Sequence, residues 1–410
     1  MAVVKPFLAY RPRKDIVSQV AALPYDVYNR EEAKQAVEGN PLSFLNIDRA
    51  ETQFDDSVDT YADCVYEKAR ELLDNMIERG DYLQERKPVY YIYELIMEGR
   101  SQTGIVACAS IDDYINGVIK KHENTRADKE ADRIRHVDTC NAQTGPIFLA
   151  YRAKKEIDDI VSAIKQTEPE YGFVSEDGIA HNVWIVCDDS HINTISKAFG
   201  EMSHIYIADG HHRAASAIKV GIKHREEADV KEPEAEYNYF LSVLFPDNQL
   251  KILPYNRVVR DLNGYNKEEF LNRVSEHFKV KAVDKAFSPQ EKYTYGMYLE
   301  GKWYSLTADE NIREDDPVNG LDVSILKNYL LEPILGIEDP RTDKRIDFVG
   351  GIRGLGELEK RVNTDMKVAF SMYPTSIDEL FNVADAGLLM PPKSTWFEPK
   401  LRSGIFIHRL

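Results

Sequence analysis

The sequence predicts a mixed α/β fold of several interlocked lobes, and three observations lead to this prediction. Short apolar runs typical of buried strands alternate with helical segments between residues 183 and 217, as in α/β units. The chain has 410 residues, which is too long for one ordinary core. It contains no internal repeat and no low-complexity linker, so interlocked lobes are expected rather than a chain of tethered modules.

The elements follow from the spacing of apolar residues. Residues 56–79 carry them at helical intervals, and Gly80 closes the segment, so a long amphipathic helix is expected there. Residues 89–97 and 102–111 flank a glycine-containing turn and predict a β-hairpin, and 238–245 with 250–254 predict another. We expect an N-terminal α/β lobe (1–116), a core with the chemical motifs (117–265) and a C-terminal α/β lobe (266–410).

Composition restricts the possible partners. Hydrophobic residues make up 43% of the chain and charged residues 30%, and 52 basic against 69 acidic residues give a formal charge of −17. Such a charge opposes binding to nucleic acid or to an anionic membrane.

No apolar run approaches the ~20 residues that span a bilayer, and the first residues do not resemble a signal peptide. A cytoplasmic protein is expected. The four cysteines are too widely spaced for a zinc knuckle or a disulfide scaffold.

The most informative stretch is residues 205–217, where an apolar strand runs into Asp209-Gly210-His211-His212-Arg213 and then into an alanine-rich helix. Gly210 permits a tight strand-to-helix turn, and the free N–H groups of the first helical turn form an anion site. Asp209 can hold a metal or accept a proton, and Arg213 can bind a phosphate with two hydrogen bonds. Phosphate chemistry fits these groups best.

Two further segments contain polar groups suited to the same chemistry. His122 and Glu123 follow a strand-like run, and Arg126 begins a helix on which Lys129, Arg133 and His136 recur on one side, where they would line a pocket. Near the C-terminus, two prolines precede basic and hydroxyl side chains in an otherwise acidic protein, a local anion trap. These side chains belong to Lys393, Ser394, Thr395 and Lys400.

Three segments together resemble a widespread bacterial family known only as domain of unknown function 1015. They are residues 121–148, the junction 208–213 and the tail 390–400. The Asp-Gly-His-His-Arg motif is also similar to that of the ParB/sulfiredoxin-like superfamily, especially its free-serine kinases, which implies a ParB/sulfiredoxin-like core around this junction. In those kinases the aspartate, second histidine and arginine lie in the nucleotide and phosphoryl-transfer site, which implies such roles for Asp209, His212 and Arg213. Sulfiredoxins have a cysteine in the motif, and this chain has none there.

We therefore expect a small-molecule kinase that transfers a phosphoryl group from ATP or ADP to a hydroxyl metabolite, with free L-serine the leading acceptor. The expected partners are these small molecules, with a homodimer also compatible, and Mg²⁺ is the expected cofactor, with Asp209 holding it or orienting the acceptor. Glu123 or His122 would take the hydroxyl proton. Phosphate would be bound by Gly210, His211, Arg126, Lys129, Arg133, His136, Lys393, Ser394, Thr395 and Lys400.

Two alternatives remain open at this point. A metal-dependent hydrolase would use histidines and a carboxylate as ligands, although no H-E-x-x-H pattern is present. Its ligands would come from His122, Glu123, His136, His211 and His212. A non-catalytic sensor of a nucleotide or phosphorylated metabolite is the second alternative.

Overall fold

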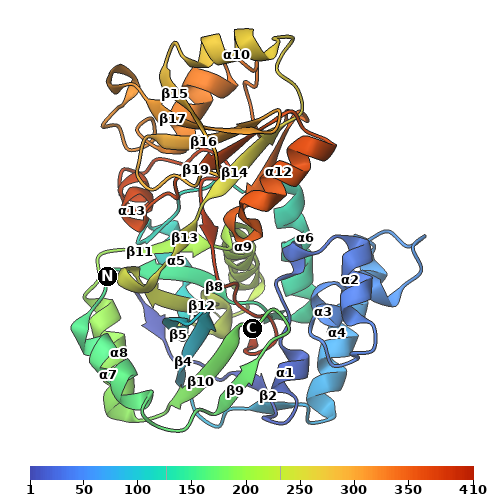
Figure 1. Cartoon of the computed structure of the whole chain (residues 1–410). Coiled ribbons are helices and arrows are strands. Elements are labelled where there is room, and N and C mark those ends of the chain that lie inside the picture. Colours follow the sequence, from blue (N-terminus) through green and yellow to red (C-terminus); the bar gives the residue numbers. More distant parts are fainter. Residues whose placement is uncertain (126, 231) are drawn as a thin grey trace. The chain divides into compact units, whose positions relative to one another are not determined.

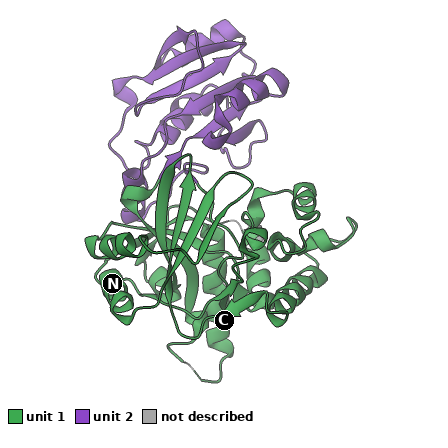
Figure 2. Ribbon diagram, turned by 60° about the horizontal axis from the view of Figure 1, so that its bottom comes forward, with its two compact units in different colours: residues 1–250, 399–410 green, residues 251–398 purple. Residues whose placement is uncertain are grey.

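The computed structural model describes residues 1–410 other than 126 and 231. The chain forms two compact units, which Figure 2 colours separately: residues 1–250 with 399–410, and residues 251–398. Both units combine helices with a sheet, so the predicted mixed α/β class is confirmed. The ParB/sulfiredoxin-like description of the core stays a prediction.

The first unit is built on a nine-stranded sheet with strand order β6-β11-β8-β12-β5-β4-β10-β9, in which β1 also pairs with β5 (Figure 1). Most neighbours are antiparallel, whereas β11 runs parallel to β6 and β12 parallel to β8. The strands are β1 (Val4–Lys5), β4 (Tyr90–Met97), β5 (Arg100–Ser110), β6 (Ile119–Lys120), β8 (Ile147–Tyr151), β9 (Tyr171–Val174), β10 (Ala180–Val186), β11 (Ile205–Asp209) and β12 (Tyr239–Pro246).

Alternate residues of these strands form the main core with four helices, because successive side chains of a strand point to opposite faces. Ile105 and Ala107 of β5 and Ile147 and Leu149 of β8 are examples, all nearly or completely buried. The helices of this layer are α5 (Ile111–Ile115), α7 (Lys155–Ile164), α8 (Asp189–Gly200) and α9 (His211–Glu227).

A second apolar cluster in this unit joins the N-terminal helices to the end of the chain. The C-terminal segment returns to this unit, where Ser403 forms a bridge with Ala22 and Ile407 one with Tyr10. The elements here are α1 (Val17–Val20), α2 (Arg30–Val37), α3 (Leu45–Asp48), α4 (Asp63–Glu78), α6 (Ala127–Cys140), and the strand pairs β2 (Tyr10–Pro12) with β3 (Tyr82–Gln84) and β7 (Ala142–Gln143) with β21 (His408–Arg409).

The second unit contains a six-stranded sheet with strand order β15-β17-β16-β19-β14-β18 and its own apolar cluster. The strands are β14 (Tyr255–Val259), β15 (Phe278–Val283), β16 (Thr294–Leu299), β17 (Lys302–Ala308), β18 (Ile346–Gly350) and β19 (Val368–Met372), and β13 (Ile252–Leu253) pairs with β20 (Trp396–Phe397). The helices are α10 (Lys267–Val274), α11 (Asp322–Leu326), α12 (Gly354–Thr364) and α13 (Ile377–Asp385).

The two compact units have different boundaries from those of the three expected lobes. β4 and β5 of the expected first lobe share one sheet with β8 and β12 of the expected core. A boundary at residue 265 would separate β14 from β18 and β19, with which it pairs. Strand pairing between distant segments therefore defines the units, and sequence order does not show such pairing.

The predicted helices and strands agree with the structure more often than the predicted lobe boundaries do. The 89–111 hairpin is confirmed as β4 and β5, joined through Glu98 and Gly99, both of which have positive φ. The helix expected over 56–79 begins only at Asp63. The hairpin expected over 238–254 is wrong, because both edges of β12 pair elsewhere, with β5 and β8. Among the described residues, no helix is long and apolar enough to cross a bilayer.

Candidate functional site

Two adjacent parallel strands place the chemical motifs side by side. Ile119 and Lys120 of β6 lie opposite Ile205 and Tyr206 of β11, so the residues that follow both strands emerge at the same sheet edge. His122 and Glu123 follow β6, and the Asp209–Arg213 motif follows β11. Gly210 has φ +89°, and α9 begins at the next residue. The left-handed conformation, which glycine adopts at little cost, makes the predicted tight turn possible.

Asp209 is held as a carboxylate between two donors. Its Oδ1 accepts the Gly210 N–H at 2.7 Å, and its Oδ2 accepts the Lys400 Nζ at 2.9 Å. Burial by itself would raise the pKa of Asp209, but the Lys400 ammonium and the Arg213 guanidinium outweigh it and hold the pKa well below its usual range. The carboxyl group is therefore ionised at neutral pH.

Arg213 lies beneath the turn in the third position of α9. Its Nη1 donates to the Pro146 carbonyl at 2.7 Å. A Cβ atom at Gly210 would lie 3.2 Å from the Arg213 Nε, and one at Gly145 would lie 3.6 Å from Nη1. The absence of a side chain at Gly210 therefore leaves room for the guanidinium group, whereas the distance at Gly145 is an ordinary van der Waals contact.

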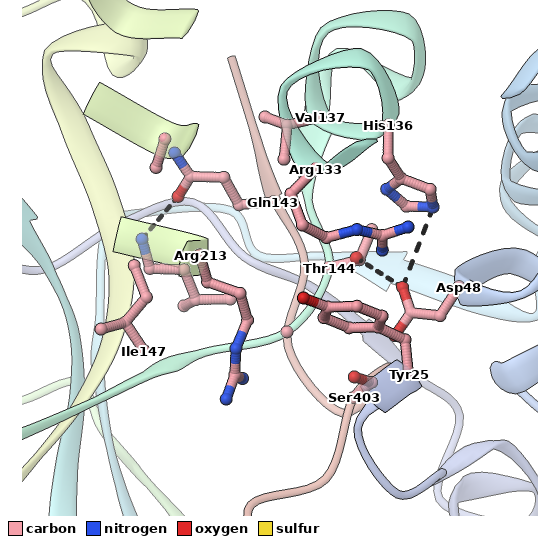
Figure 3. A pocket seen from close by; sticks show the side chains of 13 residues that line it. Tyr25, Asp48, Arg133, His136, Val137, Gln143, Thr144, Ile147, Arg213 and Ser403 are labelled. Atoms are coloured by element: carbon pink, nitrogen blue, oxygen red, sulfur yellow. Dashed lines mark hydrogen bonds and ion pairs between the residues drawn. The ribbon is translucent and has the colours of Figure 1, made fainter. Parts of the chain in front are cut away.

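A small cavity of about 30 Å³ lies beside Arg213, between α6 and α9 (Figure 3). Arg133 lines it and stacks on the ring of Tyr25, with the guanidinium carbon 4.0 Å from the ring centroid. Asp48 accepts the Thr144 hydroxyl at 2.9 Å. Two guanidinium groups and one carboxylate give the cavity net positive charge. The lining is completed by His136, Val137, Gln143, Gly145, Ile147, Ala217, Leu241 and Ser403.

A larger pocket of about 290 Å³ shares Tyr25, Asp48, Arg133 and His136 with the cavity. Lys129 also lines it, so Lys129, Arg133 and His136 of α6 all border this pocket, and their predicted role in phosphate binding stays a prediction. Burial raises the pKa of Tyr25 to about 12, so its hydroxyl is neutral at neutral pH. The pocket therefore offers a ligand a neutral phenol and three cationic side chains, those of Arg49, Lys129 and Arg133, beside the four carboxylates of Asp26, Asp48, Glu51 and Asp132.

His136 does not join the other histidines. Its Nε2 is 3.1 Å from the Ile47 carbonyl and 3.9 Å from Asp48 Oδ1. Burial and the neighbouring Arg133 lower its pKa. The structure instead brings together one donor atom each of His122, Glu123 and His211, all within 4.8 Å of one another.

The imidazole rings of His122 and His211 meet edge to face, with their centroids 4.5 Å apart. His211 Nδ1 lies 3.9 Å from Glu123 Oε2. Burial lowers the pKa of His122 to about 4, and burial together with His122 lowers the pKa of His211. Both rings are therefore neutral at neutral pH. His212 follows in α9, where its carbonyl accepts the Ser216 hydroxyl at 2.7 Å.

The expected C-terminal anion loop is divided between the units. Lys400 belongs to the first unit and reaches Asp209, whereas Lys393, Ser394 and Thr395 belong to the second. Backbone contacts occupy that loop: the Lys393 carbonyl accepts the Arg257 guanidinium at 3.1 Å, and the Ser394 hydroxyl donates to the Pro391 carbonyl at 2.6 Å. Arg126 lies outside the described residues.

Sequence reasoning missed Asp48 and Ser403. Both line the cavity, yet neither belongs to a motif. Asp48 ends the four-residue helix α3, and Ser403 reaches the cavity only because the C-terminal segment pairs with Ala22. Their positions depend on contacts between segments that are far apart in the sequence, and no local signal in the sequence shows them.

The sequence model of a family described as "Protein of unknown function (DUF1015)" matches residues 4–324. The chain belongs to this family. The resemblance to it noted from three motifs is thereby confirmed. A search of curated proteins found no significant match for this DUF1015 chain.

Solved structures similar to this DUF1015 protein include a free serine kinase variant in complex with AMP, with 14% identity, a TM-score of 0.37 and coverage of 76% of this chain and 88% of that one. C-terminally truncated SbnI from Staphylococcus aureus has 10% identity and a TM-score of 0.39, and the match covers 72% and 82% of the two chains. A conserved hypothetical protein from Pyrococcus furiosus has 15% identity and a TM-score of 0.34, with coverage of 75% and 95%.

Proposed function

We propose that this protein is a phosphotransferase that moves a phosphoryl group from ATP or ADP to the hydroxyl group of a small metabolite, with free L-serine the leading acceptor. The observation that carries the proposal is the arginine-lined cavity near the start of α9. Arg133 and Arg213 line it together with the hydroxyl-bearing side chains of Thr144 and Ser403. Guanidinium groups beside the N-terminus of a helix favour a phosphate group.

The larger pocket suits the rest of a nucleotide. Its volume of about 290 Å³ is at the lower end of the range for small-molecule sites. Tyr25 and Arg133 form a wall shared by both spaces. A nucleotide in the larger pocket would thus direct its phosphates toward Arg133 and Arg213.

The transfer itself needs charge stabilisation and positioning more than covalent help. An oxygen of the acceptor hydroxyl forms a bond to the terminal phosphorus, and the bond from that phosphorus to the bridging oxygen breaks. The nucleotide leaves with one phosphate fewer. Arg213, His212 and the N–H groups of α9 stabilise the charge on the moving group, and Glu123, at the same sheet edge, accepts the hydroxyl proton.

Asp209 by itself does not fit Mg²⁺. It is a single carboxylate, and the Lys400 ammonium lies 2.9 Å from one of its oxygens, where it competes with a cation. Mg²⁺ is held largely by phosphate oxygens and water in nucleotide sites, so we assign it no protein ligand here. We propose instead that Asp209 orients Lys400 and the acceptor.

The proposal can be tested by incubating the protein with ATP or ADP, Mg²⁺ and a panel of amino acids and polyols, and by following new phosphomonoesters by phosphorus NMR. Asp209→Asn should abolish product. Its stability should fall by less than about 1 kcal/mol, because the Asp209–Lys400 pair is partly exposed. Undiminished product in this variant would remove Asp209 from the mechanism.

Arg213→Lys gives a second test, because lysine keeps the charge but not the planar pair of donors. We expect at least a roughly tenfold loss of kcat/KM. Arg225→Lys on the same helix is the matched control, since Arg225 binds Asp112 on the surface. Equal activity of the two variants would contradict the phosphate-binding role of Arg213.

A further inference from the structure

The cluster of His122, Glu123 and His211 has the composition of a metal centre. One donor atom from each residue lies within 4.8 Å of the other two. In a tetrahedral zinc site with bonds of about 2.1 Å, donor atoms lie roughly 3.4 Å apart. Small side-chain rotations would bring these three donors to that separation. The strands β6 and β11 fix the backbone on both sides, since they are paired neighbours.

His122 supplies an independent observation. His122 is 2% exposed, and among the described residues neither ring nitrogen makes a hydrogen bond of ordinary distance and angle, although the backbone of Ile207 lies near the ring. A buried polar group without a partner costs free energy. By contrast, the buried His408 is paired at both nitrogens, with Glu236 at 2.7 Å and Gln143 at 3.3 Å. The ring nitrogens of His122 are therefore available to a ligand that is not part of the protein chain.

We propose that His122, Glu123 and His211 bind one divalent transition-metal ion, with Zn²⁺ the best match. Imidazole and carboxylate donors suit Zn²⁺, whereas Mg²⁺ prefers oxygen ligands alone. Three protein ligands leave a fourth position for water or a substrate oxygen, as in catalytic rather than structural zinc sites.

This inference rests on the geometry of the cluster and not on the proposed phosphoryl transfer. A bound ion would make Glu123 a ligand, so the metal and the acceptor hydroxyl compete for this carboxylate. Metal binding is measured without turnover. Failure of one proposal is therefore distinguishable from failure of the other.

The test is a titration of the full-length protein, stripped with a chelator, with Zn²⁺ alone in a calorimeter. We expect one ion per chain. Co²⁺ should give the visible absorption of a four- or five-coordinate site, without a thiolate charge-transfer band. His122→Ala should abolish this binding, and Glu123→Gln should weaken it at least roughly tenfold. Glu123 has a side chain that is 42% exposed, so its variant keeps the fold even if the alanine variant does not.

Two controls separate this site from adventitious binding. His191→Ala replaces a partly exposed histidine of α8 and should bind as the parent does. Cys64→Ser/Cys187→Ser removes both exposed thiols and should also leave binding unchanged. Absence of stoichiometric binding, loss of binding in the cysteine variant, or undiminished binding by Glu123→Gln would each overturn the proposal.

Discussion

Asp322 offers a quantitative test of the packing in the second unit. It begins α11 and is 7% exposed. The Tyr293 N–H donates to both of its oxygens, at 2.9 and 3.1 Å. Burial raises the pKa of this carboxyl group to about 7. The Tyr293 N–H opposes the shift, and the nearby Glu379 and Lys292 act in opposite directions. The charged form of Asp322 is therefore disfavoured in the folded protein.

The sign and size of the effect follow from linkage. A pKa raised on folding stabilises the folded state at low pH, and this contribution is lost as pH rises from about 4 to about 7. The difference between about 7 and the ordinary value of 3.8, at about 1.4 kcal/mol per pH unit, comes to about 4 kcal/mol. Asp322→Asn stays neutral at every pH. The variant should become more stable than the parent by up to this amount as pH rises from 4 to 8.

The assay uses tryptophan fluorescence during urea unfolding. The protein has three tryptophans, of which Trp303 and Trp396 lie in the second unit and Trp184 in the first. In proteins that also carry Trp184→Phe, the tryptophan fluorescence therefore comes from the second unit alone. The free energy of unfolding of the Asp322→Asn protein is compared with that of its parent at several pH values.

The matched control is Asp284→Asn, which changes an exposed carboxyl group of the same unit. Its difference from the parent should stay within about 0.5 kcal/mol, as is usual for surface substitutions. The reasoning is refuted if the stability difference between the Asp322→Asn protein and its parent is the same at pH 5 and pH 8.

Three further outcomes are expected. Gly404→Ala should destabilise the first unit by about 2–4 kcal/mol, because Gly404 has φ +83° and a Cβ atom would overlap Phe44; an unchanged thermal unfolding midpoint would contradict this. Gly210→Ala should lower the free energy of unfolding, measured with urea, by about 1–2 kcal/mol, because Gly210 has φ +89°. A decrease below about 0.5 kcal/mol would show that the turn relaxes freely. Lys400→Met should weaken nucleotide binding about tenfold in a titration, which corresponds to about 1.4 kcal/mol. The control Lys197→Met on α8 should leave the affinity unchanged. Equal affinities of the two variants would show that Lys400 serves only to hold the fold.

Several features of this protein could be predicted from the sequence because short-range physics fixes them. The β4–β5 hairpin depends on two alternating apolar runs and on a turn at Glu98-Gly99, all within one short segment of the chain. The turn at Gly210 and the helix that follows depend on one glycine and an alanine-rich segment. The side of α6 that faces the pocket follows from helical periodicity.

The tertiary structure alone decided which distant groups meet. β12 has the pattern of a hairpin strand, yet it lies in the middle of a sheet, because β5 and β8 occupy both of its edges. Lys400 reaches Asp209 across 191 positions of sequence, and its neighbours Lys393 to Thr395 fold with the other unit. The His122–Glu123–His211 cluster depends on the parallel pairing of β6 with β11. Such pairings depend on the balance of burial over the whole chain, and a local pattern does not encode that balance.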